Sequence, residues 1–188
     1  MTLRKGASLR TVTAAVGDAL RRDGIRGVVT GGSCASLHSD GAYQSQDIDI
    51  VLSGRVTRQE LDRSLASIGF VRRGDRYVHS GSPFFVEFPR GPLAVGGDEN
   101  VRPVELVVGR TRFLALSPTD SCRDRLAQFF HWKDRQSLSV AVLIAARRRV
   151  NLRRIRTWSA AEGFEDQFEE FLRYLRDARA GKAPRRRP

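Results

Sequence analysis

Two short stretches decide the fold of this chain: Gly31-Gly32-Ser33 and Ser45-Gln46-Asp47-Ile48-Asp49. The first follows an apolar segment, residues 25–30, which predicts a short buried strand, and residues 34–38 after it predict the beginning of a helix. The second opens residues 46–52, where aliphatic and acidic side chains alternate as they do on a half-buried strand. The sequence therefore predicts a strand, a glycine turn, a helix and then an acidic strand.

The paired acids of the second stretch indicate metal chemistry. Asp47 and Asp49 lie on the same face of the predicted strand, separated by a rise of about 6.6 Å. That spacing lets two carboxylates converge on metal ions about 3.5–4 Å apart, an arrangement used for phosphoryl transfer. Taken alone, such a pair is more often a solvated strand face, so the prediction depends on its surroundings.

The glycine turn supplies those surroundings. Glycine lets backbone amides approach phosphate oxygens, and the N-terminus of a following helix favours anions. We expect Gly31 and Gly32 to cradle phosphates, with the hydroxyl groups of Ser33 and Ser45 in the same nucleotide-binding site. The turn and the acidic strand together predict a site for a nucleoside triphosphate (NTP) and two Mg²⁺ ions held by the paired acids.

The two stretches resemble the signature of the polymerase-β-like nucleotidyltransferase superfamily. The resemblance implies an α/β fold, metal-dependent nucleotidyl transfer, and a third metal-binding and catalytic carboxylate on a later strand. Glu87, in Phe84-Phe85-Val86-Glu87-Phe88, is the first candidate for that acid, and Glu105 is its rival. The alternative for Glu87 is an exposed edge-strand position, because a carboxylate among apolar neighbours is costly without a partner.

A second resemblance lies in residues 117–138, which are similar to later motifs of AbiEii-type and MenT-type nucleotidyltransferase toxins. Arg123 stands where those motifs have a lysine, and Lys133-Asp134 begins the stretch that matches their aspartate motif, with Ser137 in place of a second acid. On one unbroken helix Arg123 and Asp134 would share a face, since their separation is about three turns. The resemblance implies that Arg123, Lys133 and Asp134 bind the nucleotide; the alternative is an ordinary surface ion pair.

Hydrophobic periodicity gives the remaining elements. It predicts helices over residues 8–22, 57–69, 118–130, 135–149, 152–160 and 164–180, and strands over residues 70–73, 76–79, 84–88 and 104–108. The predicted architecture is an α/β nucleotidyltransferase core with a mixed β-sheet, residues 1–116, followed by a C-terminal helical bundle, residues 117–180. Residues 181–188 are expected to be a disordered basic tail.

Charge favours a polyanionic partner. The 188 residues include 33 Lys and Arg against 21 Asp and Glu, a net charge of +12, and neutralised phosphates release counterions. The alternative is that solvated faces simply carry arginine. The arginines of residues 147–149 and 153–156 could face RNA or only solvent, and the aromatic residues 129–132 are expected in the core rather than against a nucleobase.

Composition also excludes some classes of protein. No apolar run approaches the roughly 18 residues that a membrane span needs, so we expect a cytoplasmic protein with no membrane segment. Two cysteines and three scattered histidines offer neither a disulfide framework nor a zinc site.

The leading functional hypothesis is transfer of a nucleoside monophosphate from an NTP to a hydroxyl of RNA, such as a tRNA 3′ end. In that hypothesis the chain is a toxin or phage-defence effector with a cognate antitoxin as its partner. The alternatives are nucleotidyl transfer to a small molecule or a protein, and an inactive nucleotide-binding module. The departures at Arg123 and Ser137 motivate the last alternative.

Overall fold

The computed structural model describes residues 3–181. Its elements follow one another along the chain as α1 (Leu9–Arg22), β1 (Gly27–Val29), α2 (Gly31–His38), β2 (Asp47–Leu52), α3 (Arg58–Ala66), β3 (Val71–Arg73), β4 (Arg76–Val78), β5 (Phe85–Glu87), β6 (Val104–Val108), β7 (Thr111–Ala115), α4 (Pro118–Trp132), α5 (Arg135–Arg147), α6 (Leu152–Ala161) and α7 (Glu165–Arg179). The predicted fold class, a mixed sheet with helices and a helical C-terminal half, is confirmed.

A single mixed sheet organises the first half of the described chain. Its strand order is β3-β4-β5-β2-β1-β7-β6. The acidic strand β2 lies near the middle, antiparallel to β1 and parallel to β5. The register of the parallel pair sets Asp49 beside Glu87, so an acid of one strand lies directly next to an acid of the other.

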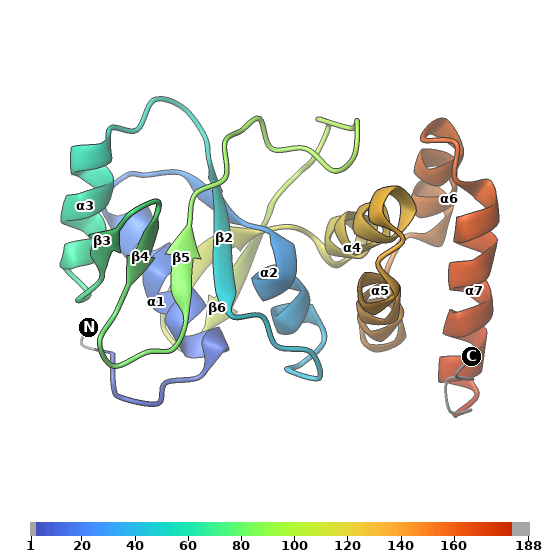
Figure 1. The fold of residues 1–188 in the computed structure, drawn as a ribbon, viewed down its shortest axis with the longest axis horizontal. Helices are drawn as coiled ribbons and strands as arrows, with labels where there is room; N and C mark the ends of the chain where they lie inside the picture. Colours follow the sequence, from blue (N-terminus) through green and yellow to red (C-terminus); the bar gives the residue numbers. More distant parts are fainter. Residues whose placement is uncertain (1–2, 182–188) are drawn as a thin grey trace.

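The helices divide into two groups (Figure 1). Helix α1 lies behind β3, β4 and β5 in this view, α3 stands beside β3 at the left, and α2 lies between β2 and the helical half of the chain. Helices α4 to α7 gather to the right of the sheet. Capping fixes where several of them begin: the Ser117 hydroxyl accepts the Asp120 N–H at the start of α4, and Thr57 and Glu60 form a capping box at α3.

Strand β7 is absent from the sequence prediction, which ended the sheet at residue 108. It follows a tight turn at Gly109, pairs antiparallel with β6, and lies parallel to β1. Phe113 and Ala115 alternate inward and are buried, whereas Arg112 points outward and forms an ion pair with Glu105. The strand thus connects β1 to the edge strand β6.

The chain between Arg123 and Asp134 is not one unbroken helix, in agreement with the separate helices predicted over residues 118–130 and 135–149. The condition under which the two residues would share a helical face is therefore not met. Helix α4 ends at Trp132, and Lys133 adopts a left-handed conformation with φ 55°. Asp134 then caps α5, where its carboxylate accepts the N–H groups of Gln136 and Ser137. The left-handed residue turns the chain into a new helix.

A buried arginine ties α4 to its neighbours. Arg123 is fully buried, and its guanidinium bonds Asp120 at 2.8 Å and Asp98 at 2.6 Å. Its Cζ also lies 4.8 Å from the centre of the Trp158 ring in α6. Arg154 completes the cluster with a 3.0 Å contact to the buried Asp120 carboxylate. These contacts join the loop before β6, α4 and α6.

No helix within residues 3–181 is long and apolar enough to cross a membrane. The division of the chain at residues 116 and 117 stays a prediction. The predicted basic tail lies outside the described residues, except for Gly181.

We expect Arg123→Ala to destabilise the fold by about 3–5 kcal/mol, because it leaves the carboxylate of Asp120 buried without its main partner. Urea denaturation followed by circular dichroism measures this loss. Arg112→Ala removes an exposed ion pair and should cost about 1 kcal/mol or less. Equal losses in the two variants would contradict the structural role of Arg123.

Candidate active site

Three carboxylates meet at the centre of the sheet. Asp47 and Asp49 project from β2 on one face, and Glu87 projects from the adjacent β5 on the same face. Each contributes a carboxylate oxygen, and these oxygens all lie within 4.8 Å of one another. The register thereby separates the two candidates for the third acid: Glu87 lies beside the pair, whereas Glu105 lies on the edge strand β6 with Arg112.

The acids impose an electrostatic cost on one another. Partial burial, followed by the charges of Asp47 and Glu87, raises the pKa of Asp49 from 3.8 to about 6. Because like charges this close oppose ionisation, the cluster favours either a proton or a cation among its oxygens. Oxygen-rich clusters of this kind are what Mg²⁺ prefers in proteins.

The glycine turn touches the acidic strand. Gly31 has φ +60°, and a Cβ atom at this position would clash with the Asp49 carboxylate. A Cβ atom at Gly32 would meet the Ser45 hydroxyl at 2.6 Å and the Tyr43 hydroxyl at 3.2 Å. Both positions therefore need glycine for the turn to reach the acids.

The N-terminus of α2 lies at the same place. The amide of Thr30 bonds the Asp49 carbonyl at 2.9 Å, and the helix begins at the next residue. The Thr30 side chain makes no capping bond, and the N–H groups of the first helical turn have no intrahelical acceptor. Such a terminus favours a phosphate group.

The two serines of the predicted site hold the local structure. Ser33 is buried, and its hydroxyl donates to the Thr30 carbonyl at 3.2 Å. Ser45 donates its hydroxyl to the Asp47 carboxylate. Ser33 can therefore contribute its amide more readily than its hydroxyl, and Ser45 orients one of the three acids.

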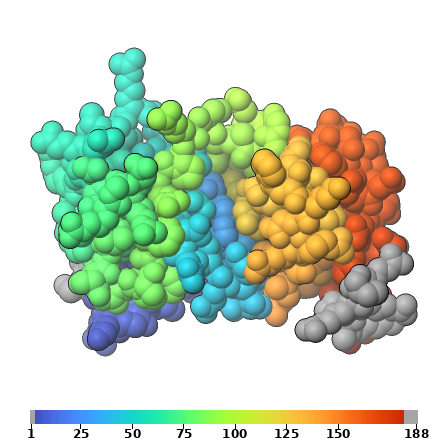
Figure 2. Space-filling view, in the orientation of Figure 1, coloured from blue at the N-terminus to red at the C-terminus, as the bar shows by residue number. Residues whose placement is uncertain are grey.

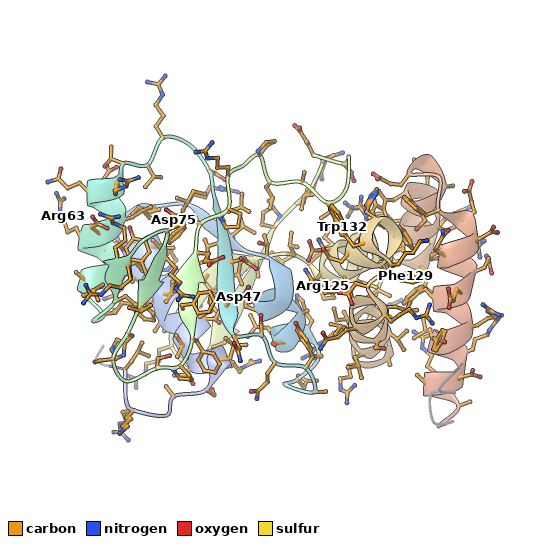
Figure 3. The ribbon with its side chains drawn as sticks, in the orientation of Figure 1. Asp47, Arg63, Asp75, Arg125, Phe129 and Trp132 are labelled. Atoms are coloured by element: carbon orange, nitrogen blue, oxygen red, sulfur yellow. The ribbon has the colours of Figure 1, made fainter. Side chains whose placement is uncertain are left out.

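Arg125 is a site residue that the sequence prediction missed. It lies on α4, and its charge opposes the rise in the pKa of the Asp49 carboxyl, although less strongly than burial and the neighbouring acids, Asp124 among them, cause that rise. Asp124 holds the guanidinium through two nitrogen atoms, at 2.7 Å and 3.1 Å. Figure 3 shows Asp47 on β2 and Arg125 on α4 on facing elements. The sequence offered one indication of this residue: Arg125 follows Arg123 by two positions, so on a helix it points to a different side from Arg123.

The residues expected at the triphosphate differ in position. Arg123 is buried against Asp98, Asp120 and Trp158, away from the three acids. Lys133 is exposed at the end of α4. Asp134 lies close enough to Arg125 for the guanidinium to lower the pKa of its carboxyl, although its bonds to Ser137 contribute most to that decrease. Asp134 therefore lies near Arg125, which in turn lies near the three acids.

The space between the two halves of the molecule is open. Figure 2 shows a hollow between the cyan and green surface of β2 and β5 and the gold surface of α4 and α5, with blue segments of the earlier chain at its floor. Asp47 lies on the β2 side of this region, and Arg125 lies on the α4 side (Figure 3).

The aromatic stretch divides between the core and the surface. Phe129 and Phe130 are buried, as expected, and His131 lies 3.5 Å from Glu162 and packs edge-on against Phe164. Trp132 is 76% exposed, so the expectation of a core position is wrong for this residue. It ends α4, where no further helical turn covers its ring.

Three of the six arginines in residues 147–156 form ion pairs. Arg148 pairs with Asp40, Arg154 with Asp120, and Arg156 with Glu169 at 2.8 Å. These partners reduce the charge that residues 147–156 can offer to RNA.

Comparison with known proteins supports the fold. No protein family was found to match the sequence, and no curated protein matches it. A crystal structure of an antigenic nucleotidyltransferase-like protein from Paracoccidioides brasiliensis is similar, with a TM-score of 0.56 and 17% identity over 75% of this chain and 77% of that one. The chain thus shares the fold of a nucleotidyltransferase-like protein.

Two structures of ANT(2″)-Ia show lower similarity. The crystal structure in complex with adenylyl-2″-tobramycin has a TM-score of 0.48 and 15% identity over 86% of this chain and 95% of that one. The solution structure of the same antibiotic-resistance factor also has a TM-score of 0.48 and 15% identity, over 93% and 96%. None of these similarities bears on the resemblance of residues 117–138 to toxin motifs, which stays a prediction.

The raised pKa of Asp49 gives a stability prediction for the metal-free protein. Between about pH 4 and pH 6 the folded Asp49 carboxyl binds more protons than the unfolded one, so its contribution to stability falls as pH rises. In EDTA at pH 7.5, Asp49→Asn should melt at least about 2 °C above the wild type, with a smaller difference at pH 4.5. Scanning calorimetry measures both.

The matched control is Asp75→Asn in the exposed turn between β3 and β4 (Figure 3), which should leave the melting temperature and its pH dependence unchanged. A melting temperature of Asp49→Asn at or below that of the wild type at pH 7.5 would contradict the electrostatic cost inferred for this carboxylate.

Proposed function

We propose that the chain is a metal-dependent nucleotidyltransferase that moves a nucleoside monophosphate from an NTP to an acceptor hydroxyl. The observation that carries this proposal is the meeting of three carboxylates with a glycine turn and a helix N-terminus. A catalyst of phosphoryl transfer needs both parts: acids for cations, and donors for phosphate oxygens.

The residues fit the Mg²⁺ ions that this chemistry implies. Asp47, Asp49 and Glu87 offer hard oxygen ligands within 4.8 Å of one another. The absence of a side chain at Gly31 lets the turn lie directly against the Asp49 carboxylate. When bound, the ions would neutralise the charge that develops on the reacting phosphate group.

The remaining roles belong to groups of the chain itself. The amides of Gly32 and Ser33 donate to the β- and γ-phosphates at the N-terminus of α2. Arg125, oriented by Asp124, binds the triphosphate from the opposite side, where its planar guanidinium can form two bonds to phosphate oxygens. The carboxylate of Asp49 or Glu87 accepts the proton of the attacking hydroxyl.

We propose RNA as the acceptor, with a tRNA 3′ end as the specific case. The net charge of +12 supports a polyanionic acceptor over a cationic small molecule, because like charges repel. The similarity of residues 117–138 to toxin motifs supports a toxin or phage-defence role with an antitoxin partner. Transfer to a small molecule or a protein, and nucleotide binding without catalysis, are the competing functions.

Incubation with total RNA, Mg²⁺ and each α-³²P-labelled NTP tests the proposal. We expect label in RNA with at least one NTP, and incorporation below about 1% of that value in Asp47→Ala and Glu87→Gln, because each removes a metal-binding or proton-accepting oxygen. Glu105→Gln is the matched control, since Glu105 lies on the far edge strand, and should retain full activity.

Two results would overturn the proposal in different ways. If the wild type binds no Mg²⁺–NTP in calorimetry, nucleotidyl transfer fails altogether. Binding without transfer to RNA, protein or a small hydroxylated acceptor would identify an inactive nucleotide-binding module.

Arg125→Gln should raise the KM for the NTP by about 10–100-fold, since a charged hydrogen bond to phosphate is lost. Steady-state kinetics with varied NTP separate KM from kcat. Arg21→Gln on α1, whose partner is Asp18, is the control and should change neither value. A KM equal to that of the wild type would exclude Arg125 from the triphosphate site.

A further inference from the structure

A row of charged side chains crosses four strands and ends at the metal-binding acids. The register pairs Arg73 of β3 with Arg76 of β4, Arg76 with Glu87 of β5, and Glu87 with Asp49 of β2. Residues that face each other across a sheet point to the same side. The two arginines therefore lie on the face of the sheet that carries the three carboxylates.

Apolar groups form a parallel row on this face. Val71 pairs with Val78, and Phe85 pairs with Asp47. Val71 is 51% exposed, and Phe85 is half-buried with the Arg76 guanidinium carbon 4.6 Å from its ring centre. In Figure 1 helix α1 lies behind these strands and α3 stands beside β3 at the left, and no helix of residues 3–181 is drawn in front of them. This open face is defined here by Val71, Arg73, Arg76, Val78 and Phe85.

The two arginines of the open face lie opposite each other, and only Arg76 also has an acid, Glu87, opposite it in the register. Both are exposed, and neither forms an ion pair among residues 3–181. Like charges directly opposite on neighbouring strands destabilise a sheet, so their pairing needs another reason. Arg72 on the opposite face is the contrast, since it lies 3.5 Å from Asp62. A bound anion would relieve the repulsion between Arg73 and Arg76.

The in-line geometry of nucleotidyl transfer indicates which substrate would lie on the open face. In the proposed function the triphosphate lies toward the N-terminus of α2 and Arg125, on the β1 side of β2. The acceptor hydroxyl attacks in line, opposite the departing pyrophosphate. The open face lies on that other side, because the strand order continues from β2 to β5, β4 and β3.

We infer that the open face binds the 3′-terminal nucleotides of a single-stranded RNA acceptor, an inference that rests on the proposed function for its catalytic purpose. Arg73 and Arg76 bind backbone phosphates. The Arg76 guanidinium, which lies over the Phe85 ring in the structure, moves to a phosphate, and Phe85 with Val78 then gives an unpaired base a surface to stack on. Sheets that present aromatic and basic side chains suit unpaired bases, since every base has a π-face. A duplex would cover its bases.

Fluorescence anisotropy with a 5′-labelled single-stranded RNA of mixed sequence tests the inference, in Mg²⁺ and without NTP. The double variant Arg73→Gln/Arg76→Gln should bind about tenfold more weakly, with a salt dependence smaller by about 1.4 in log–log slope, because two phosphate contacts are lost. Phe85→Leu should weaken binding about fivefold or more and leave the slope unchanged.

Arg72→Gln is the control: it removes one arginine charge from β3 on the opposite face and should bind RNA as the wild type does. Circular dichroism melting checks that each variant is folded. If the double variant keeps the wild-type affinity and slope, or if the wild type binds no single-stranded RNA, the inference is overturned.

Mg²⁺–NTP binding, measured by calorimetry on the same proteins, separates this inference from the proposed function. We expect the double variant to bind Mg²⁺–NTP like the wild type, which locates the loss in acceptor binding. If the double variant binds both Mg²⁺–NTP and RNA as the wild type does, only the inference that the open face binds RNA is overturned. Absence of NTP binding in the wild type would overturn the proposed function instead.

Discussion

Gly31 and the Asp49 carboxylate lie so close together that no side chain fits between them. The last backbone bond between their strands, from the Thr30 amide to the Asp49 carbonyl at 2.9 Å, holds the turn in place. Because β1 ends there and α2 begins at the next residue, the free amides of a helix N-terminus lie beside three acids. The positive end of the helix favours ionised carboxylates, yet burial and mutual repulsion prevail at Asp49, whose pKa is raised to about 6.

The second constraint is that two arginines of α4 make different contacts. Two residues along a helix differ in direction by about 200°, so Arg123 and Arg125 face different surroundings. Arg123 is buried between Asp98 and Asp120 and against Trp158, which fixes the position of α4. With the helix held in this way, Arg125 is presented toward Asp49 and is oriented by Asp124. A purely structural contact therefore determines where a functional charge lies.

Much of this arrangement could be predicted from local sequence, because alternation, glycine and capping residues act over a few positions. Asp47 and Asp49, the turn at Gly31 and the start of α4 at Ser117 are of this kind. Three features depend on distant contacts. Strand β7 is held by its parallel pairing with β1, the choice of Glu87 over Glu105 follows from strand register, and which α4 arginine is buried depends on α6. The hydrophobic pattern predicted the break between α4 and α5, but the left-handed Lys133 is not a glycine, so no local signal placed the turn at that residue.

The charges around the site imply an order of events. The three acids repel phosphate until cations neutralise them, so an acceptor RNA held only by the open face would keep its terminal phosphates away from β2. Arg76 and Arg73 lie one and two strands beyond Glu87, about 5 Å and about 10 Å away at the usual strand spacing. Charges still act over such distances at physiological salt, where the screening length is about 8 Å. They can therefore hold the RNA beside the acids while the centre is still negative. In the proposed function, Asp47, Asp49 and Glu87 would hold the metal ions that accompany the nucleotide, whose positive charge would remove this repulsion and let the acceptor hydroxyl approach. Separate positive charges on the two sides of an acidic centre thus let each substrate bind without the other.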